Sequence, residues 1–344
     1  MNNIYTINEY QVSDGQKLEV LVIGDPHFKV NNVPESKLLT TKLLQLAKKM
    51  QPTFIVCLGD LLHRHETIHV TPLMRAEELI AGLSEVAPTF LIIGNHDRPN
   101  NSNFLTNEHP FNALKRWSNV FIIDTVQTFT FDDKIFTFVP YVSPGRFLEA
   151  LNTCPGWEKS QCIFAHQEFY GAQMGAIKSQ NGDHWSQEYP LVISGHIHDY
   201  QTLASNLIYV GTPYQHAFGD KDDKTVSIFK FGPEIKETRI DLLLMKRIIV
   251  YLTPEKIYDY EPPLNKLVKI VVRGDEVDIK ACMKSSHIQR LKEEGCTVTF
   301  KTLVSKAVVT KTKDEPKRYL ERLYEKVENQ ALQKRWVDKL FITV

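Results

Sequence analysis

The chain has 344 residues, 42% of them hydrophobic and 24% charged, and its formal net charge is zero. These values suit a globular protein with one large and one small domain, and they argue against a generally basic nucleic-acid binder. From Asp241 onward there are 21 Lys and Arg against 15 Asp and Glu, whereas the preceding part holds 20 against 26. An acidic first part suits metal-binding carboxylates, and a basic last part suits either phosphate contacts or a solvated surface.

The sequence shows no targeting or membrane-spanning segment. Its first residues lack a basic start and an apolar core, and no run of eighteen apolar residues occurs. We therefore expect an intracellular protein without membrane contact. The five cysteines lack the spacing of a disulfide framework, so reduced thiols are expected.

The first part alternates predicted strands and helices. Apolar runs at residues 20–23, 54–58 and 90–93 are predicted strands, and residues 36–50 and 71–87 carry apolar side chains at helical spacing. Thr71 is expected to cap the second helix, with Pro72 in its first position. The order strand, helix, strand, helix, strand predicts a parallel sheet with helices outside it.

Beyond residue 120 the pattern changes to strands joined by short turns, at residues 120–123, 126–131, 135–139, 207–210 and 226–231. They predict a second, more antiparallel sheet packed on the first, and hence an α/β fold, in four-layer α+β form, of two sheets flanked by helices. The glycine- and polar-rich segment between His166 and Tyr189 is expected to be a substrate-facing loop.

A domain boundary is expected near residue 243, so that residues 1–243 form the first domain. Residues 247–252, 267–272, a helix near 275–294 and residues 297–303 predict a small β-β-α-β unit within a domain of residues 244–310. In the remaining segment, 311–344, a helix at residues 316–341 carries an apolar stripe. That stripe either packs on its own domain or docks on a partner.

Several predicted strands end in the same way, at a glycine followed by Asp, Asn or His. The four such segments are Gly24-Asp25-Pro26-His27, Gly59-Asp60-Leu61-Leu62-His63, Gly94-Asn95-His96-Asp97 and Gly195-His196-Ile197-His198, and a fifth strand ends on His166. A single acid at a strand end is more often a cap or turn residue. So many repeats indicate that strand ends place ligands at one edge of a sheet, where open α/β sheets build their sites.

The strand-end residues are too numerous for one ion and suit two divalent cations with Asp60 shared; the predicted ligands are Asp25, His27, Asp60, Asn95, His166, His196 and His198. Two adjacent metals are the usual apparatus of phosphoesterases, since they activate water and stabilise in-line displacement at phosphorus. The nitrogen and oxygen ligands, without thiolate, favour Mn²⁺, Fe or Zn²⁺ over Ca²⁺. Mn²⁺ is the expected metal in a cell that keeps its zinc scarce, and Mg²⁺ is a further alternative.

Three further residues are candidate catalytic groups. His96 follows the amide ligand and precedes Asp97, which could orient it, so His96 is placed to touch the phosphate or protonate the leaving oxygen; a structural role is the alternative. His63 is expected to support the metal ligands, contact phosphate or be exposed. The other histidines are expected to be surface residues: His65, His69, His109, His184, His216 and His287.

These motifs, in their order and spacing across residues 18–231, resemble the calcineurin-like metallophosphoesterase superfamily. Protein serine/threonine phosphatases carry Asp-Arg-Gly after the bridging aspartate, whereas this chain resembles the SbcD-type recombination and repair nucleases. The segments 166–171 and 209–220 are similar to phage members of that branch. The resemblance therefore favours a bacterial or viral protein, located in the cytoplasm of a bacterium or an infected host cell.

The resemblance implies specific roles. Asp25, His27, Asp60 and His198 would hold one metal, and Asp60, Asn95, His166 and His196 the other, with His96 as the transition-state acid and His63 placing the scissile phosphate. Residues 247–303 would form the capping domain that shapes DNA entry.

The implied activity is that of a Mn²⁺-dependent DNA exonuclease or endonuclease acting on double-strand ends in repair, recombination or replication. The resemblance also implies an assembly, a homodimer within a heterotetramer that contains an SbcC-type coiled-coil ATPase. This chain has no Gly-x-x-x-x-Gly-Lys-Ser/Thr loop, so any ATP dependence would come from such a partner. The alternatives are a phosphoesterase acting on nucleotides, phospholipid precursors or phosphoproteins, and a DNA-end-binding scaffold with structural metals.

Overall fold

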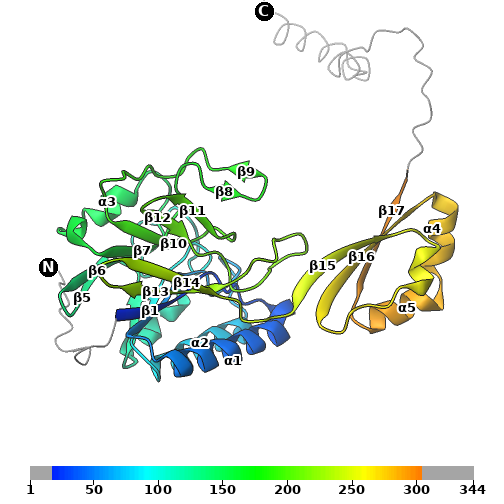
Figure 1. Ribbon diagram of the computed structural model, residues 1–344, viewed down its shortest axis with the longest axis horizontal. Helices are drawn as coiled ribbons and strands as arrows, with labels where there is room; N and C mark the ends of the chain where they lie inside the picture. The colour runs from blue at the N-terminus through cyan, green and yellow to red at the C-terminus, as the bar shows by residue number, and fades with distance from the viewer. Residues whose placement is uncertain (1–17, 304–344) are drawn as a thin grey trace, which may run out of the picture.

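Two six-stranded sheets packed face to face form the larger part of the protein, and a three-stranded sheet with two helices forms the smaller part (Figure 1). The computed structural model describes residues 18–303. The helix predicted at residues 316–341 lies outside this range. The two mixed sheets and their flanking helices confirm the predicted α/β sandwich.

The first sheet places β1 to β4 side by side and adds β13 and β14 beyond β1. The first four strands run parallel, while β13 runs antiparallel to β1 and β14 antiparallel to β13. The strands are β1 (Leu18–Ile23), β2 (Phe54–Cys57), β3 (Thr89–Ile92), β4 (Val120–Ile123), β13 (Val226–Phe231) and β14 (Ile235–Ile240). With α1 (Val33–Met50) and α2 (Val70–Ser84) between them, β1, β2 and β3 confirm the predicted strand-helix order.

The ends of the two helices follow from local chemistry. A proline in its first turn starts α1, and Gln51 ends it in the left-handed conformation, at a φ of 48°. Helix α2 begins at Val70, so Thr71 lies inside the helix and the predicted cap was wrong. Pro72 is compatible with any position of the first turn, where its missing N–H has no helical partner, and so it does not fix the starting residue.

The second sheet has the order β11-β12-β10-β7-β6-β5. The expectation that it is more antiparallel than the first sheet was wrong, because β6, β7, β10 and β12 are parallel neighbours and the runs at 120–123 and 226–231 joined the first sheet. Alternation identifies a strand but does not identify its partner. The strands are β5 (Gln127–Phe131), β6 (Lys134–Val139), β7 (Cys162–His166), β10 (Leu191–Gly195), β11 (Gln201–Ala204) and β12 (Leu207–Tyr209).

Smaller elements fill the connections. The predicted loop between residues 166 and 189 contains a two-stranded hairpin, β8 (Gln173–Met174) and β9 (Ile177–Lys178). A short helix, α3 (Phe147–Leu151), and four 3-10 helices complete the described part; the latter span Val30–Asn32, Pro110–Arg116, Trp157–Lys159 and Lys256–Asp259. Within residues 18–303 no helix is both long and apolar enough to cross a membrane.

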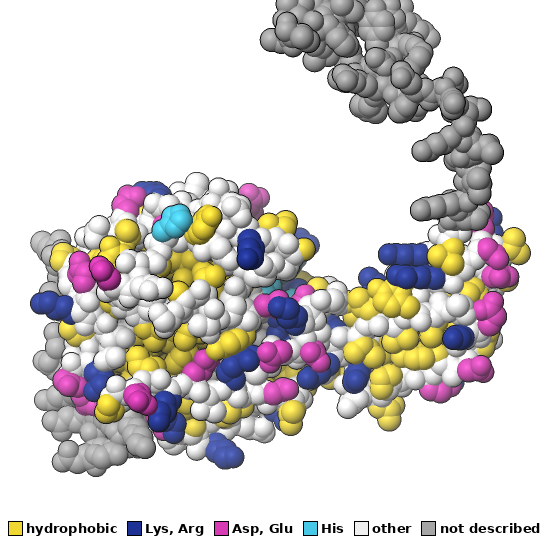
Figure 2. Space-filling model, turned by 45° about the horizontal axis from the view of Figure 1, so that its top comes forward, with side chains coloured by type: hydrophobic (Ala, Val, Ile, Leu, Met, Phe, Trp, Pro, Cys, Tyr) yellow, Lys and Arg dark blue, Asp and Glu magenta, His cyan; other side chains and the backbone are white. Residues whose placement is uncertain are grey.

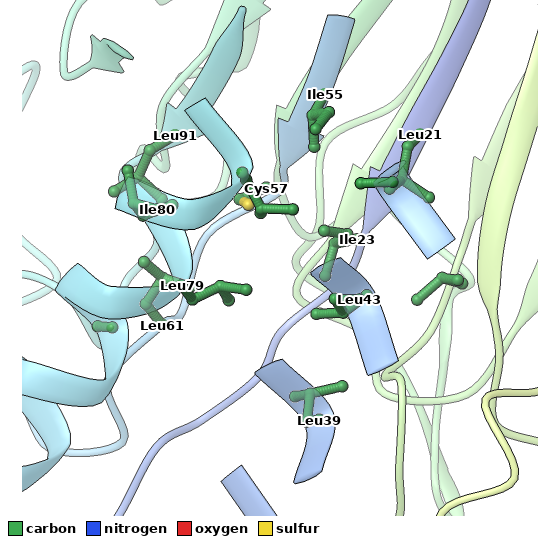
Figure 3. Close-up of a cluster of buried hydrophobic side chains, with 14 of the residues drawn as sticks. Leu21, Ile23, Leu39, Leu43, Ile55, Cys57, Leu61, Leu79, Ile80 and Leu91 are labelled. Atoms are coloured by element: carbon green, nitrogen blue, oxygen red, sulfur yellow. The ribbon is translucent and has the colours of Figure 1, made fainter. Parts of the chain in front are cut away.

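Both faces of the first sheet are apolar because both are covered. Leu21 and Ile23 of β1 face α1 and α2, where they meet Leu39, Leu43 and Ile80 (Figure 3). The alternate residues of β1 face the second sheet and join a phenylalanine-rich core. In that core the ring centroids of Phe54 and Phe131 lie 4.3 Å apart in a stacked pair. The two sheets are thereby packed against each other, which positions their strand ends.

The smaller part, here called the three-stranded unit, spans residues 246–303. Its parallel strands are β15 (Lys246–Leu252), β16 (Lys266–Gly274) and β17 (Thr297–Thr302). The single helix expected at 275–294 is two helices, α4 (Glu276–Met283) and α5 (Ser286–Glu293), because Ser285 caps the second through its side chain. Arg247 joins the unit to the sandwich through Glu35, at 2.8 Å, and through Gln215.

A buried ionic cluster fastens the 3-10 helix at 110–116 to the end of β4. His109 accepts the Phe111 N–H at Nδ1, and its Nε2 lies 3.2 Å from Asp124 Oδ2, which Lys115 also contacts. Burial alone would raise the pKa of Asp124, but the hydrogen bonds from His109 and Lys115 outweigh it and hold that pKa below its ordinary value.

We expect Asp124→Asn to lower the free energy of unfolding at pH 7 by about 1–3 kcal/mol, because it leaves the ammonium group of Lys115 and the Nε2–H of His109 poorly paired. The folded-state pKa of Asp124 is lowered, so its contribution is present above the ordinary aspartate pKa and is lost as the pH falls through the lowered value. Urea unfolding of both proteins at stepwise lower pH should show their difference shrinking. The exposed Asp133→Asn serves as the control, and a difference independent of pH would contradict this account.

Candidate metal centre

The residues that follow the ends of five strands meet at one place, where the two sheets come together. Side chains from the two sheets are in contact here: His27 Nε2 lies 3.1 Å from His198 Nε2, and His166 Nε2 lies 2.9 Å from Asn95 Oδ1. The structure therefore brings together all seven predicted ligands, namely Asp25 and His27 after β1, Asp60 after β2, Asn95 after β3, His166 at the end of β7, and His196 and His198 after β10.

The turns that present these side chains have unusual backbone conformations. His27, Asp60 and His196 have φ values of 46°, 50° and 77°, in the left-handed region that side chains other than glycine rarely adopt. Such conformations persist only where the surrounding structure imposes them, and they cluster at functional sites. Gly94 permits a close approach of the carboxylate, since a Cβ atom at that position would lie 2.2 Å from Asp60 Oδ1.

The ligand atoms form two groups that each suit one cation. Asp25, His27 and His198 make the first group, with their ligand atoms within 4.8 Å of one another. Asp60, His166 and His196 make the second, and the oxygen of Asn95 belongs with it, 2.9 Å from a ring nitrogen of each of these two histidines.

Asp60 lies between the two groups. Its Oδ2 is 3.6 Å from His27 Nε2 of the first group and 3.4 Å from His166 Nε2 of the second. Its other oxygen, Oδ1, accepts the backbone N–H of His96 at 2.8 Å. This arrangement fixes the carboxylate and leaves Oδ2 to face both groups, as a bridging ligand requires.

The donor atoms fit divalent cations. Asp25 repeats the pattern of Asp60: its Oδ2 accepts the His196 N–H at 2.8 Å, and its Oδ1 is buried without a hydrogen-bond partner. A buried carboxylate oxygen with no donor is costly, and a cation supplies what it lacks. Nitrogen and oxygen ligands at about 2.0–2.2 Å from one ion lie about 3 Å apart, which is the separation of His27 Nε2 and His198 Nε2.

Burial and neighbouring charge set the protonation of these groups. Burial lowers the pKa of His27 well below its ordinary value and that of His198 to about 4, so both imidazoles are neutral at pH 7 and offer lone pairs. Burial raises the pKa of Asp25 to about 7. At Asp60, burial is outweighed by the charge of His166 and its hydrogen bond, which lower the pKa well below its ordinary value.

His96 lies beside the first ligand group. Its Nδ1 is 2.7 Å from the carbonyl oxygen of His63, so Nδ1 is the donor and Nε2 remains available. The ring centroid of His96 is 4.9 Å from that of His27 and 5.7 Å from that of His63, whose ring is parallel to it. His63 Nδ1 in turn lies 3.4 Å from His27 Nδ1.

Asp97 supports the turns rather than the ring of His96. Its two oxygens accept the backbone N–H groups of Leu62 and Gly94, at 3.0 and 3.1 Å. Among the hydrogen bonds of residues 18–303, none joins this carboxylate to the ring of His96, and the carbonyl of His63 takes the orienting position instead.

Three histidines expected on the surface are not free surface groups. The ring of His216 lies 4.9 Å from that of His27, and its Nε2 is 2.9 Å from the backbone oxygen of Asp25. The ring of His65 stacks on that of His96 at 4.4 Å. His109 is buried in the ionic cluster of β4. Histidine type alone carries no burial signal, and the available hint for His216 was its place inside the 209–220 segment that resembles the phage proteins.

The fold and this site define a class of enzyme. Residues 18–200 match the family model described as calcineurin-like phosphoesterase. The chain belongs to this family, whose members use divalent metals. The match covers the strands that supply all seven ligands.

Two viral relatives are similar over most of their length. The chain is 41% identical over 78% of its length to "Putative phosphoesterase 244L" of Invertebrate iridescent virus 6, of which it covers 99%. It is 40% identical over 91% of its length to "Putative phosphoesterase 078R" of Invertebrate iridescent virus 3, of which it covers 92%. A more distant relative, "Exonuclease subunit 1" of Enterobacteria phage T4, is 26% identical over 72% of this chain and 73% of its own.

We expect Gly94→Ala to weaken Mn²⁺ binding by roughly 10- to 100-fold, because the new Cβ displaces the carboxylate of Asp60. Isothermal titration measures the affinity, and circular dichroism shows whether the fold is kept. Gly232→Ala is the matched control, since the nearest atom to its Cβ would be 3.7 Å away. Wild-type affinity in the folded Gly94→Ala variant would contradict the assigned place of Asp60.

Proposed function

We propose that the protein is a dimetal, Mn²⁺-dependent phosphodiesterase that cleaves DNA at double-strand ends. The observation that carries the phosphodiesterase chemistry is the position of Asp60 Oδ2 between two separate ligand groups. Two divalent metals held there would activate water, polarise the phosphate and stabilise in-line displacement. Mn²⁺ is the proposed metal, and the imidazole nitrogens and carboxylate and amide oxygens, without thiolate, suit Fe and Zn²⁺ as well.

The chain's own residues perform the remaining tasks. Asp25, His27, Asp60 and His198 would hold one cation, and Asp60, Asn95, His166 and His196 the other. These ligands come from turns of fixed backbone geometry, so a phosphate at the centre would meet a preorganised site.

His96 is the proposed general acid for the leaving oxygen. With Nδ1 committed to the His63 carbonyl, Nε2 is the nitrogen that can hold and deliver a proton. Burial lowers the pKa of His96, which makes the protonated ring a readier donor. His63 would help to place the phosphate from its position beside His27. Asp97 would keep the His63 and His96 turns in register through its two backbone hydrogen bonds.

DNA is preferred over small phosphate esters for two reasons. A relative bears the name of an exonuclease subunit, and basic residues predominate after residue 240. We also propose that residues 244–310 form a capping domain beside the nuclease domain of residues 1–243. The anchoring of Arg247 to Gln215 and Glu35 supports that placement.

An SbcC-type ATPase is the proposed partner, within an assembly that contains two copies of this chain. The support is the printed name of the phage relative, which describes a subunit. Residues 311–344 are the proposed docking segment. Truncation at Asp314 should abolish co-purification of the ATPase and leave phosphodiesterase activity on small substrates intact; retained co-purification would remove the segment from this role.

The activity test uses His96→Ala with plasmid and oligonucleotide DNA in the presence of Mn²⁺. We expect cleavage to fall by about 10²- to 10⁴-fold while Mn²⁺ binding persists, because an acid is lost and no ligand is removed. His69→Ala, in the loop before α2, is the matched control. Cyclic nucleotides and p-nitrophenyl phosphate are assayed in parallel. If wild-type protein cleaves these but no DNA, the nuclease proposal fails; if it cleaves nothing, the metals are structural.

A further inference from the structure

The sheet of the three-stranded unit has one face that neither α4 nor α5 covers. The residues that pack with the helices alternate along the strands, for example Val268, Ile270 and Val272 of β16. Successive side chains of a strand point to opposite faces, so the residues between them lie on the other face. The open face is therefore built by Ile249 and Tyr251 of β15, Leu267, Lys269, Val271 and Arg273 of β16, and Thr297, Thr299 and Lys301 of β17.

The strand register sets these residues in rows. Tyr251, Val271 and Thr299 form one row, and Arg273 pairs with Lys301 in the next. Tyr251 is 55% exposed, although it is a large aromatic residue on a strand. Val271 is buried at 4% exposure between its neighbours. The face thus has an apolar floor and an exposed ring.

The charge of the open face has one sign. Its strand positions include Lys269, Arg273 and Lys301 and no acidic residue. Within the described chain, no ion pair involves any of these three cations. The guanidinium carbon of Arg273 lies 4.1 Å from the centroid of the Tyr251 ring. In Figure 2 the smaller part of the molecule shows Lys and Arg side chains gathered beside a broad hydrophobic area.

We propose that this open sheet face binds a single-stranded nucleic acid. An exposed aromatic ring stacks with any base, and unpaired cations around it neutralise backbone phosphates, which is how sites without sequence preference hold single strands. The arginine over the ring adds a second planar group for stacking. The phosphates of a duplex could also contact the cations, but the bases of a duplex are already stacked on one another. The exposed Tyr251 ring therefore favours a single strand.

The open face is connected to the metal centre. At the start of β15, the backbone N–H of Arg247 donates to Gln215 Oε1 at 2.6 Å. His216, which follows Gln215 in the chain, contacts the backbone oxygen of Asp25. Tyr251 lies four residues further along the strand, about 13 Å from Arg247. A strand of a few nucleotides could therefore reach from the face toward the centre. The origin of that strand, an unpaired DNA end, rests on the proposed nuclease function; the binding itself does not.

Other occupants fit the charges less well. A second copy of the same face would bring like charges together. Residues 304–344 carry ten Lys and Arg against six Asp and Glu, so they are basic as well. An acidic peptide would match the cations but would give the exposed ring no stacked partner.

The test measures fluorescence anisotropy of a labelled oligodeoxythymidylate with the full chain, in chelator to prevent cleavage. Tyr251→Ala should weaken binding about tenfold, and Tyr251→Phe should retain it, because stacking needs the ring alone. The triple variant Lys269→Ala, Arg273→Ala, Lys301→Ala should weaken binding further. It should also reduce the slope of log affinity against log salt by about 2, near 0.7 for each lost phosphate contact.

Lys292→Ala removes an exposed cation from α5, on the opposite side of the sheet, and is the matched control. The inference is overturned if Tyr251→Ala and the triple variant, both folded by circular dichroism, bind as wild type. It is also overturned if Lys292→Ala weakens binding of the oligodeoxythymidylate as much as the triple variant does. A third contrary outcome is a duplex that binds as tightly as the single strand and depends on Tyr251 in the same way. Hydrolysis of bis-p-nitrophenyl phosphate with Mn²⁺ should be unchanged in every variant. Binding through this face by a protein that cleaves no DNA would refute the nuclease proposal and leave this inference standing.

Discussion

The structure depends on the need to balance negative charge that is buried between two sheets. Asp25 and Asp60 are each 1% exposed, and each has one oxygen held by a backbone N–H. Their remaining oxygens face imidazoles at 3.4–3.8 Å, and Asp25 Oδ1 has no hydrogen-bond donor. Carboxylates in such a place are stable only with positive charge beside them. The neutral imidazoles of His27 and His198 add lone pairs, so the buried carboxylates and imidazoles together suit bound cations.

The packing around these buried carboxylates holds the turns that carry the ligands in place. The phenylalanine core joins the inner faces of the two sheets, and α1 and α2 cover the outer face of the first (Figure 1). Left-handed backbone at His27, Asp60 and His196 stores strain that this packing holds in place. Hydrogen bonds from behind the site complete the support: Tyr214 donates to the backbone oxygen of Pro26 at 2.7 Å. A small shift at any of these points would move a ligand atom.

The three-stranded unit contrasts with the sandwich. Among the described residues, 18–303, its sheet is covered by helices on one side only, whereas both sheets of the sandwich have two covered faces over most of their area. An uncovered face with cations and an exposed tyrosine is a surface for recognition rather than for folding. The chemistry is thus concentrated in one part of the chain and the candidate recognition surface in another, with Arg247 as the link.

The sequence by itself determined the strand-helix order of the first part and the seven strand-end residues. Both signals are local, because alternation, helical spacing and a glycine before a polar residue are readable in a few neighbouring positions. Tertiary structure alone decided the sheet to which β4 and β13 belong, the place of His216 beside His27, and the attachment of Asp97 to backbone amides. Those features depend on contacts between residues far apart in the chain, and no local pattern encodes them.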